Sequence, residues 1–473
     1  MSADALKKYC DQAWDDDIVP TLENYVRIPA KSPGFDADWE ANGHIEKAVQ
    51  LAHDWCEKHA VEGMEMQIHR LPGRTPLLFI DIPGTAPQAA EKNCVLLYGH
   101  LDKQPEFDGW REGLGPWKPV IQDGKLYGRG GADDGYAVFS SLTAVRALQE
   151  ENIPHARCVI VIELCEESGS YDLPYHFEAL AGKIGTPDLV VCLDAECGNY
   201  DQFWCTTSLR GNVVGTLRVD ILTEGVHSGG SGGVVPSSFR ILRNLLDRVE
   251  DSSSGEIKLD ALKVAIPDAR LKQTKEAADA LGDGAWHRFP FVDGAHPDTL
   301  DPVELVLANT WRACMEVTGA EGLPAPASAG NVLRPQTTVK LSFRLAPTCD
   351  PEAAAKAIKD TLEADPLVGA KVHFESDSAM GGWNAPPVAD WLGKAMQTAS
   401  QNHFGEDALY MGTGGSIPFM GMLGEQFPEA QFLVTGLLGP AANAHGPNEF
   451  LHIATGKRLT ACVAEVLAAH AKK

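Results

Sequence analysis

Three short apolar runs of this chain each end on side chains that can bind a cation, and this pattern constrains the fold most strongly. The runs cover residues 95–98, 159–164 and 189–193, and a helical stretch over residues 135–149 separates the first two. Strands that alternate with a long helix favour an α/β layer with a largely parallel sheet. In such sheets, ligand-binding side chains gather beyond the carboxyl ends of the strands. The side chains after the runs should therefore meet, and they are, in chain order, His100, Asp102, Glu166, Glu167 and Asp194.

The 473 residues of the chain exceed one ordinary domain, and the pattern of elements predicts two. After residue 210 the expected order becomes strand, helix, strand, helix, strand, with elements at residues 213–221, 237–249, 338–345, 351–363 and 371–375. That order indicates a two-layer α+β domain inserted into the first domain. We therefore predict a catalytic α/β domain with a mostly parallel mixed sheet flanked by helices, formed by residues 1–209 and 383–473. The inserted domain would span residues 210–382, with Gly381 and Gly382 as its exit hinge.

Composition argues against several classes of partner. The formal charge of −25 argues against nucleic acid, because phosphate contacts require clustered Lys and Arg. No run of about 18 apolar residues is present, so we expect no membrane span and no membrane partner. The eleven cysteines form no C-x-x-C pairs, a distribution typical of free thiols in a reducing compartment. The start of the chain lacks the apolar stretch of a secretory signal, and we predict a cytoplasmic protein.

Each candidate residue also has an ordinary structural interpretation. A His-x-Asp motif is usually a hydrogen-bonded surface pair, and two adjacent glutamates are usually solvated. Asp133 and Asp134 lie between a glycine-rich turn, residues 128–131, and a helix, where they could simply cap that helix. Asp194 could be a turn residue, and His445 could be an ordinary loop histidine. Their joint placement favours one common site, because the ordinary interpretation requires several coincidences.

Several motifs together resemble those of the M20 family of metallopeptidases. The resemblance covers nearly the whole chain, and motif order and spacing are most similar to the carnosinase-like cytosolic dipeptidase branch. It implies an enzyme that hydrolyses amide or peptide bonds with the help of bound metal. The motifs are Tyr98-Gly-His100-Leu-Asp102-x-x-Pro105, Asp108-Gly-Trp110, Gly128-Arg-Gly130-x-x-Asp133-Asp134, Glu166-Glu167-Ser168-Gly169-Ser170, Val226-His227-Ser228-Gly229, Gly414-Gly415-Ser416-Ile417-Pro418 and His445.

The resemblance implies a centre with two divalent metal ions. Asp133 would bridge the two ions, with His100 and Asp194 completing one site and Glu167 and His445 completing the other. Imidazole and carboxylate ligands suit Zn²⁺ best, while carboxylate-rich sites also accept Mn²⁺ or Co²⁺. We therefore expect zinc as the cofactor, with manganese or cobalt as alternatives.

Two further carboxylates would act beside the metal ligands. By resemblance, Asp102 would hold the His100 ring in its metal-binding tautomer. Glu166 would be the general base that activates a metal-bridging water and passes its proton to the leaving amine. The family also commonly has a cis peptide at the bond that joins Asp133 to Asp134 here.

Substrate recognition is expected from the inserted domain, which serves as a lid and dimerisation domain in this family. By resemblance, His227 would polarise the scissile carbonyl, either in its own subunit or in a neighbouring one. Arg344 is a lone cation in an apolar strand and needs an anionic partner, either the substrate's C-terminal carboxylate or a structural aspartate. Asn331 and Ser416 would add hydrogen bonds to the substrate. We expect a homodimer through the inserted domain.

Three departures from the family pattern bear on the substrate. Gly135 and Tyr136 stand where the family usually has Lys-Gly, and Lys103 adds a cation directly after Asp102. Thr413 stands where dipeptidase relatives often carry an acid that pairs with a free substrate amine. The main prediction is hydrolysis of dipeptides or short peptides with a free C-terminal carboxylate. The alternative is an amidohydrolase of N-acyl amino acids or N-succinyl-diaminopimelate, and a third possibility, a catalytically silent metal-binding scaffold, would require a lost base or lost ligands that the sequence does not show.

Overall fold

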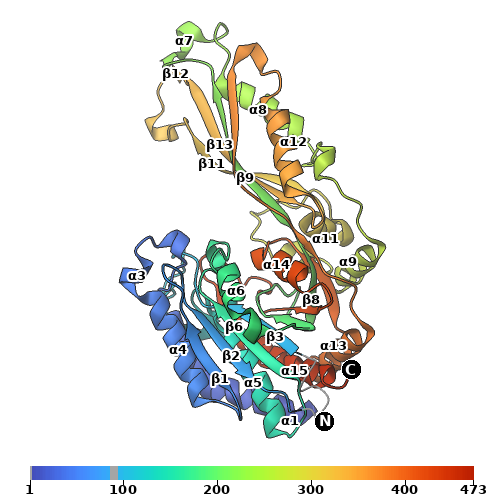
Figure 1. Cartoon of the computed structure of the whole chain (residues 1–473). Helices are drawn as coiled ribbons and strands as arrows, with labels where there is room; N and C mark the ends of the chain where they lie inside the picture. The colour runs from blue at the N-terminus through green and yellow to red at the C-terminus, as the bar shows by residue number, and fades with distance from the viewer. Residues whose placement is uncertain (1–2, 86–93) are drawn as a thin grey trace.

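The computed structural model describes residues 3–85 and 94–473, and a six-stranded sheet forms the centre of its larger part (Figure 1). The strands, in their order across the sheet, are β1 (Glu65–His69), β2 (Leu77–Ile82), β6 (Arg157–Glu163), β3 (Cys94–His100), β7 (Leu189–Cys192) and β17 (Gln431–Val434). β3 pairs in parallel with both β6 and β7, and β7 pairs in parallel with β17. The pairings of β1 with β2 and of β2 with β6 are antiparallel. The predicted mixed and mostly parallel sheet is therefore confirmed.

The middle of each central strand is apolar because both faces of the sheet are covered. In β2, Leu78 and Ile80 pack into the core on one face, whereas Leu77 and Phe79 pack into the core on the other. Successive side chains of a strand point to opposite faces, so a strand buried on both sides needs apolar residues throughout. This requirement explains why the strands appear in the sequence as unbroken apolar runs.

Helices form a layer on each face of this sheet (Figure 1). One core contains residues of α1 (Ala3–Ala13), α2 (Val19–Val26), α4 (His44–Lys58), α5 (Ala137–Glu150), α13 (Asp390–His403) and α15 (Ile453–His470). The other contains residues of α6 (Leu173–Ile184) and α14 (Pro418–Gln426). None of the described helices is both long and apolar enough to cross a membrane.

A second sheet forms the upper part of the molecule in Figure 1. Its strands, all antiparallel, are β11 (Cys314–Glu321), β13 (Gln336–Leu345), β9 (Gly211–Asp220) and β14 (Lys371–Met380). Buried residues alternate with half-exposed or exposed ones along β9, and the buried face packs on α8 (Ser238–Val249) and α12 (Pro351–Glu363). β11 is an addition to the predicted strands, and six of its residues, 316–321, are exposed, which removes the apolar alternation that marks a strand.

α12 illustrates how local sequence sets these elements. The Asp350 side chain accepts hydrogen bonds from the main-chain N–H groups of Glu352 and Ala353 at 2.9 and 3.0 Å, and Pro351 occupies the first helical position. Ala354, Ile358 and Leu362 then recur every four residues and are buried against the sheet. The helix therefore begins at a side-chain cap and buries one stripe.

Three helices within the predicted insertion pack on a different sheet, which lies beside the central one. They are α9 (Asp268–Leu281), α10 (Gly284–His287) and α11 (Pro302–Thr310). Ala277 and Val306 share an apolar cluster with Trp204 of β8 (Trp204–Leu209) and Met411 of β16 (Leu409–Thr413). Residues 268–310 therefore connect the two parts of the molecule, and the boundaries at residues 210 and 382 stay a prediction.

The chain enters and leaves the second sheet at adjacent glycines. A Cβ atom on Gly211 would lie 2.5 Å from the Met380 carbonyl oxygen, and one on Gly382 would lie 2.5 Å from the Leu209 carbonyl oxygen. Only glycine permits this close approach of two backbones. The two connections therefore cross side by side at the predicted exit hinge.

Candidate metal centre and substrate pocket

Five predicted ligands lie together beyond the carboxyl ends of the central strands. His100 Nε2 is 3.3 Å from Asp133 Oδ1 and 3.7 Å from Asp194 Oδ2. His445 Nε2 is 3.0 Å from Asp133 Oδ2 and 3.3 Å from Glu167 Oε2. The potential ligand atoms form two groups, each within 4.8 Å, and Asp133 belongs to both. The arrangement provides two adjacent cation sites that share one carboxylate.

The His100 ring is oriented so that one nitrogen faces this cluster without a partner. Its Nδ1 lies 3.1 Å from the main-chain oxygen of Asp102 and 3.5 Å from the Asp102 carboxylate. Nε2 is buried and has no hydrogen-bond partner among the described residues. Nδ1–H donates to the Asp102 oxygen, so the lone pair of Nε2 is left to bind a cation.

The Asp102 carboxylate has a further structural role that the sequence did not reveal. Its two oxygens accept hydrogen bonds from the main-chain N–H groups of Glu166 and Glu167, at 3.1 and 3.0 Å. Asp102 therefore positions the turn that carries both glutamates.

The loop before α5 has the predicted backbone geometry. The peptide bond between Asp133 and Asp134 is cis. Asp134 is fully buried, and its Oδ2 accepts a hydrogen bond from the His100 N–H at 3.3 Å. A Cβ atom on Gly99 would lie 2.6 Å from this oxygen, so Gly99 makes room for the Asp134 carboxylate.

Several carboxylates are crowded in this part of the protein. Burial and the neighbouring Asp194 raise the pKa of Glu166, and burial and Asp133 raise the pKa of Glu167. So many carboxylates in a buried space need positive charge to stay ionised together. The partnerless His100 nitrogen and this excess of acids fit two divalent cations.

The loop that carries His445 is attached to the site by a buried ion pair. Arg129 and Glu449, which are 1% and 0% exposed, form a salt bridge. Arg129 also donates to the main-chain oxygens of His445 and Gly446, at 3.2 and 2.9 Å. This pair was not predicted from the sequence, although an arginine within the glycine-rich turn of residues 128–131 indicates a buried anionic partner.

Glu163, at the end of β6, is another residue that was not predicted from the sequence to belong to this region. It accepts hydrogen bonds from the Tyr98 and Ser170 hydroxyls at 2.5 and 2.8 Å. Burial raises the pKa of Glu163 to about 8. Its place at the last position of an apolar strand was the available signal.

A cavity of about 390 Å³ opens beside the metal cluster. Its lining includes six of the predicted site residues, Asp133, Glu166, Asp194, Arg344, Ser416 and His445, and also Thr413. Arg344 Nη1 lies 3.4 Å from the Ser416 hydroxyl oxygen, which donates to the Arg210 carbonyl at 2.5 Å. Within residues 3–85 and 94–473, no carboxylate lies within 4 Å of the Arg344 guanidinium. The structural aspartate considered as its partner is thus not found, and the cation faces the cavity.

His227 and Asn331 do not line this cavity. They adjoin α7 (Ser228–Ser231) and β12 (Val332–Leu333), which lie at the far end of the second sheet (Figure 1). β10 (Val226–His227) pairs with β12 (Val332–Leu333), and the Ser228 N–H donates to the Asn331 carbonyl at 2.9 Å. His227 Nδ1 accepts from the N–H groups of Gly229 and Gly230 at 3.1 and 3.3 Å. Nε2 therefore carries the proton of the neutral ring and is the free donor. Neither residue lines the cavity of its own chain.

The departures at Gly135 and Lys103 belong to one structural unit. A Cβ atom on Gly135 would lie 2.1 Å from the Tyr25 ring, which leaves no space for the lysine of the family pattern. Lys103 is fully buried, and its Nζ lies 3.8 Å from the centre of that ring. It donates to the carbonyls of Tyr25 and Ile28, both at 2.8 Å, near the end of α2. Gly135 and Lys103 therefore belong to the packing against Tyr25 and the end of α2, and neither residue lines the cavity.

Imidazoles and carboxylates cluster at the carboxyl edge of an α/β sheet, beside a cavity lined by the guanidinium of Arg344. This arrangement is that of a metal-dependent hydrolase. The comparison with known families agrees, because the profile of Peptidase family M20/M25/M40 matches residues 96–469. The chain belongs to this family of peptidases, as its motifs predicted.

The relatives include several dipeptidases. The chain is 28% identical over 386 residues to the Cysteinylglycine-S-conjugate dipeptidase of Corynebacterium striatum, covering 79% of this chain and 81% of the relative. It is 28% identical over 369 residues to the Beta-Ala-His dipeptidase of Mus musculus, covering 74% and 71%. The structure of Dug1p from Saccharomyces cerevisiae, a di-peptidase, is similar with a TM-score of 0.77 at 22% identity, covering 100% and 99%. These relatives favour a dipeptidase over the amidohydrolase alternative.

Proposed function

We propose that this protein hydrolyses dipeptides that have a free C-terminal carboxylate, using two zinc ions. The observation that carries this proposal is the position of Asp133, whose two oxygens face His100 and His445. It lies beside a cavity lined by Arg344, which has no carboxylate partner among residues 3–85 and 94–473. Arg344 would bind the substrate carboxylate in a two-pronged contact, assisted by Ser416. The dipeptidase names of the relatives support the same substrate class.

The proposed ligands of each ion correspond to one of the two groups of potential ligand atoms described above. His100 and Asp194 would hold one ion, Glu167 and His445 the other, and Asp133 would bridge them. When bound, two such ions would polarise the scissile carbonyl and lower the pKa of a water molecule toward neutrality. Zinc suits these imidazole and carboxylate ligands, with manganese or cobalt as alternatives.

Glu166 is the proposed general base. It lines the cavity but belongs to neither group of potential metal ligands. Its carboxylate would accept the proton of the attacking water and then deliver it to the nitrogen of the leaving amine. The Asp102 carboxylate holds the main chain at Glu166 in place for this role.

The test of the proposed function is removal and return of the metal. A chelator should remove nearly all activity toward a dipeptide such as Ala-Leu, because all five ligands converge on the ions. Added Zn²⁺ or Mn²⁺ should restore the activity, and N-acetyl-leucine should be a poor substrate in the same assay. Full activity after chelation and verified metal loss would contradict the two-metal proposal. Preferential cleavage of N-acetyl-leucine would replace the dipeptidase with the amidohydrolase.

We also propose a cytoplasmic homodimer in which each cavity is completed by the partner subunit. His227 and Asn331 lie together at the far end of the second sheet and do not line the cavity of their own chain. The Nε2–H of His227 would donate to the substrate carbonyl from the neighbouring subunit, with Asn331 beside it. The eleven cysteines are free thiols, which supports a reducing compartment.

This arrangement predicts complementation between two inactive variants. His227→Ala and Glu166→Gln should each be nearly inactive alone, because each homodimer lacks a required group at both sites. A co-expressed mixture should recover about a quarter of the wild-type activity, since about half of the dimers then contain one complete site. Differently tagged chains allow the mixed dimer to be purified and assayed. If the purified mixed dimer is inactive, His227 acts within its own chain or not at all.

A further inference from the structure

The cavity contains a second pair of charged side chains that the proposed mechanism does not use. Glu196 follows Asp194 by two residues, and Arg288 follows α10 directly. A contact of 3.4 Å joins Arg288 Nη1 to Glu196 Oε2. Both side chains line the cavity, together with the ring of Phe289.

Arg288 has unused hydrogen-bonding capacity. Its side chain is only 19% exposed, and Nε is buried with no hydrogen-bond partner among the described residues. A guanidinium has five N–H donors, and a buried donor without an acceptor is costly. Arg288 therefore has room for a carboxylate in addition to its long contact with Glu196.

Among the described residues that line the cavity, Glu196 is the one acidic side chain that has no proposed role in metal binding or proton transfer. The other acidic residues in the lining are Asp133, Asp194 and Glu166, which are assigned to the metal ions and to proton transfer. Thr413 stands where related dipeptidases often have an acid, and its hydroxyl lies 3.2 Å from the Thr206 hydroxyl. A substrate ammonium group would therefore find its counter-charge at Glu196.

We propose that Glu196 and Arg288 form the subsite for the N-terminal residue and that they select an acidic side chain there. This inference rests on the proposed dipeptidase function. An ammonium group on Glu196 draws that carboxylate away from Arg288, which then needs another anion in a largely enclosed place. A substrate with Asp or Glu at its N-terminal position supplies both charges, while its C-terminal carboxylate binds Arg344.

The test compares matched substrates on the zinc-loaded wild-type enzyme. Glu-Leu and Gln-Leu differ in one charge, and kcat/KM for Glu-Leu should be about 10- to 100-fold higher, as for a hydrogen bond to a charged group. N-succinyl-leucine offers an anion without an amine and should be a poorer substrate than Glu-Leu. Equal values for Glu-Leu and Gln-Leu would overturn the subsite alone. Failure to cleave any dipeptide would overturn the dipeptidase function and the subsite with it.

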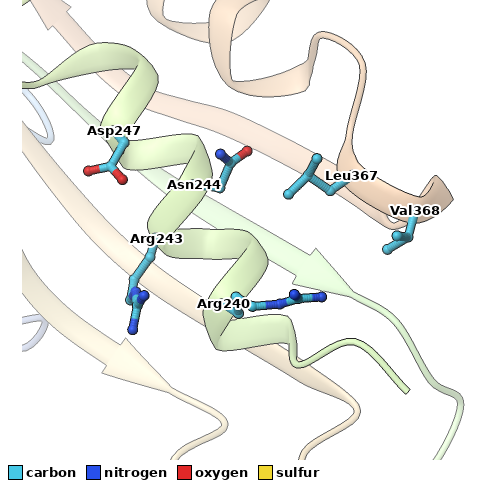
Figure 2. Close-up of a pocket in the computed structure, with 6 residues that line it drawn as sticks. All are labelled: Arg240, Arg243, Asn244, Asp247, Leu367 and Val368. Carbon is cyan, nitrogen blue, oxygen red and sulfur yellow. The ribbon is translucent and has the colours of Figure 1, made fainter. Parts of the chain in front are cut away.

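Two variants locate the preference. Arg288→Met should bring the ratio of the Glu-Leu to Gln-Leu kcat/KM values close to one. The matched control is Arg243→Met in the hollow on α8, which is separate from the metal centre and contains none of the proposed site residues (Figure 2). Glu196→Gln should raise KM for both dipeptides but not for N-succinyl-leucine, which has no ammonium group. An unchanged ratio in a folded Arg288→Met enzyme, or preferred cleavage of N-succinyl-leucine by the wild type, would overturn the assignment.

Discussion

Replacement of Glu166 by Gln should lower kcat for a dipeptide by about 10²- to 10⁴-fold, the usual contribution of a general base. Glutamine keeps the shape of the side chain but cannot accept a proton from water. The bound zinc should stay at two ions per chain, because Glu166 lies outside both groups of ligand atoms. Steady-state kinetics and elemental analysis on one preparation measure the two quantities together.

Glu57→Gln is a suitable control for this variant. Glu57 is exposed on α4, so its replacement should change neither kcat nor zinc content. If Glu166→Gln loses an equivalent of zinc, then Glu166 is a ligand and the roles of the two adjacent glutamates must be exchanged. If it retains full activity, another group must move the proton.

Replacement of Asp133 by Ala should remove both metal ions and with them the activity. Its oxygens lie 3.3 Å from His100 Nε2 and 3.0 Å from His445 Nε2, so each cation site loses a ligand at once. Loss of a group that only supports a ligand typically weakens metal binding by about 10- to 100-fold. Loss of a ligand shared by both ions should weaken the binding of each ion by more than this. Competition with a zinc chelator of known affinity measures the two dissociation constants.

The control for this variant is Asp54→Asn. Asp54 and Glu57 are exposed and form a group with the half-buried His53 that could in geometry hold a cation. Exposed acids without further support bind weakly, so the control should retain two zinc ions and full activity. Retention of one tightly bound zinc in Asp133→Ala would show that Asp133 serves only one site.

The convergence of the candidate ligands was predictable because it follows from strand direction. β3, β6 and β7 are parallel, so the polar residues just after them reach the same edge. The apolar residues within these strands pack on both faces, which leaves the strand ends as the place for charge. Family resemblance then supplied the proposed roles, and the potential ligand atoms lie in two groups that share Asp133.

Other features depend on contacts that no local pattern records. The Arg129 and Glu449 pair joins residues 320 positions apart, and Arg288 meets Glu196 across 92 positions. Each charge is costly to bury alone, so a partner is required, but packing decides which one it is. The exposed strand β11 lacks apolar alternation and exists through its pairing with β13.

The sequence by itself determined the α/β core, the order of its strands and helices, and the edge at which acids and histidines gather. These follow from side-chain periodicity and strand direction, which are local properties of the chain. Tertiary structure decided that Asp102 supports the turn of Glu166 and Glu167 and that His227 lies away from its own cavity. It also decided that Arg344 pairs with no aspartate in the described part of the chain. These depend on which distant groups meet when the core closes, because a buried polar atom takes its partner from the packing around it.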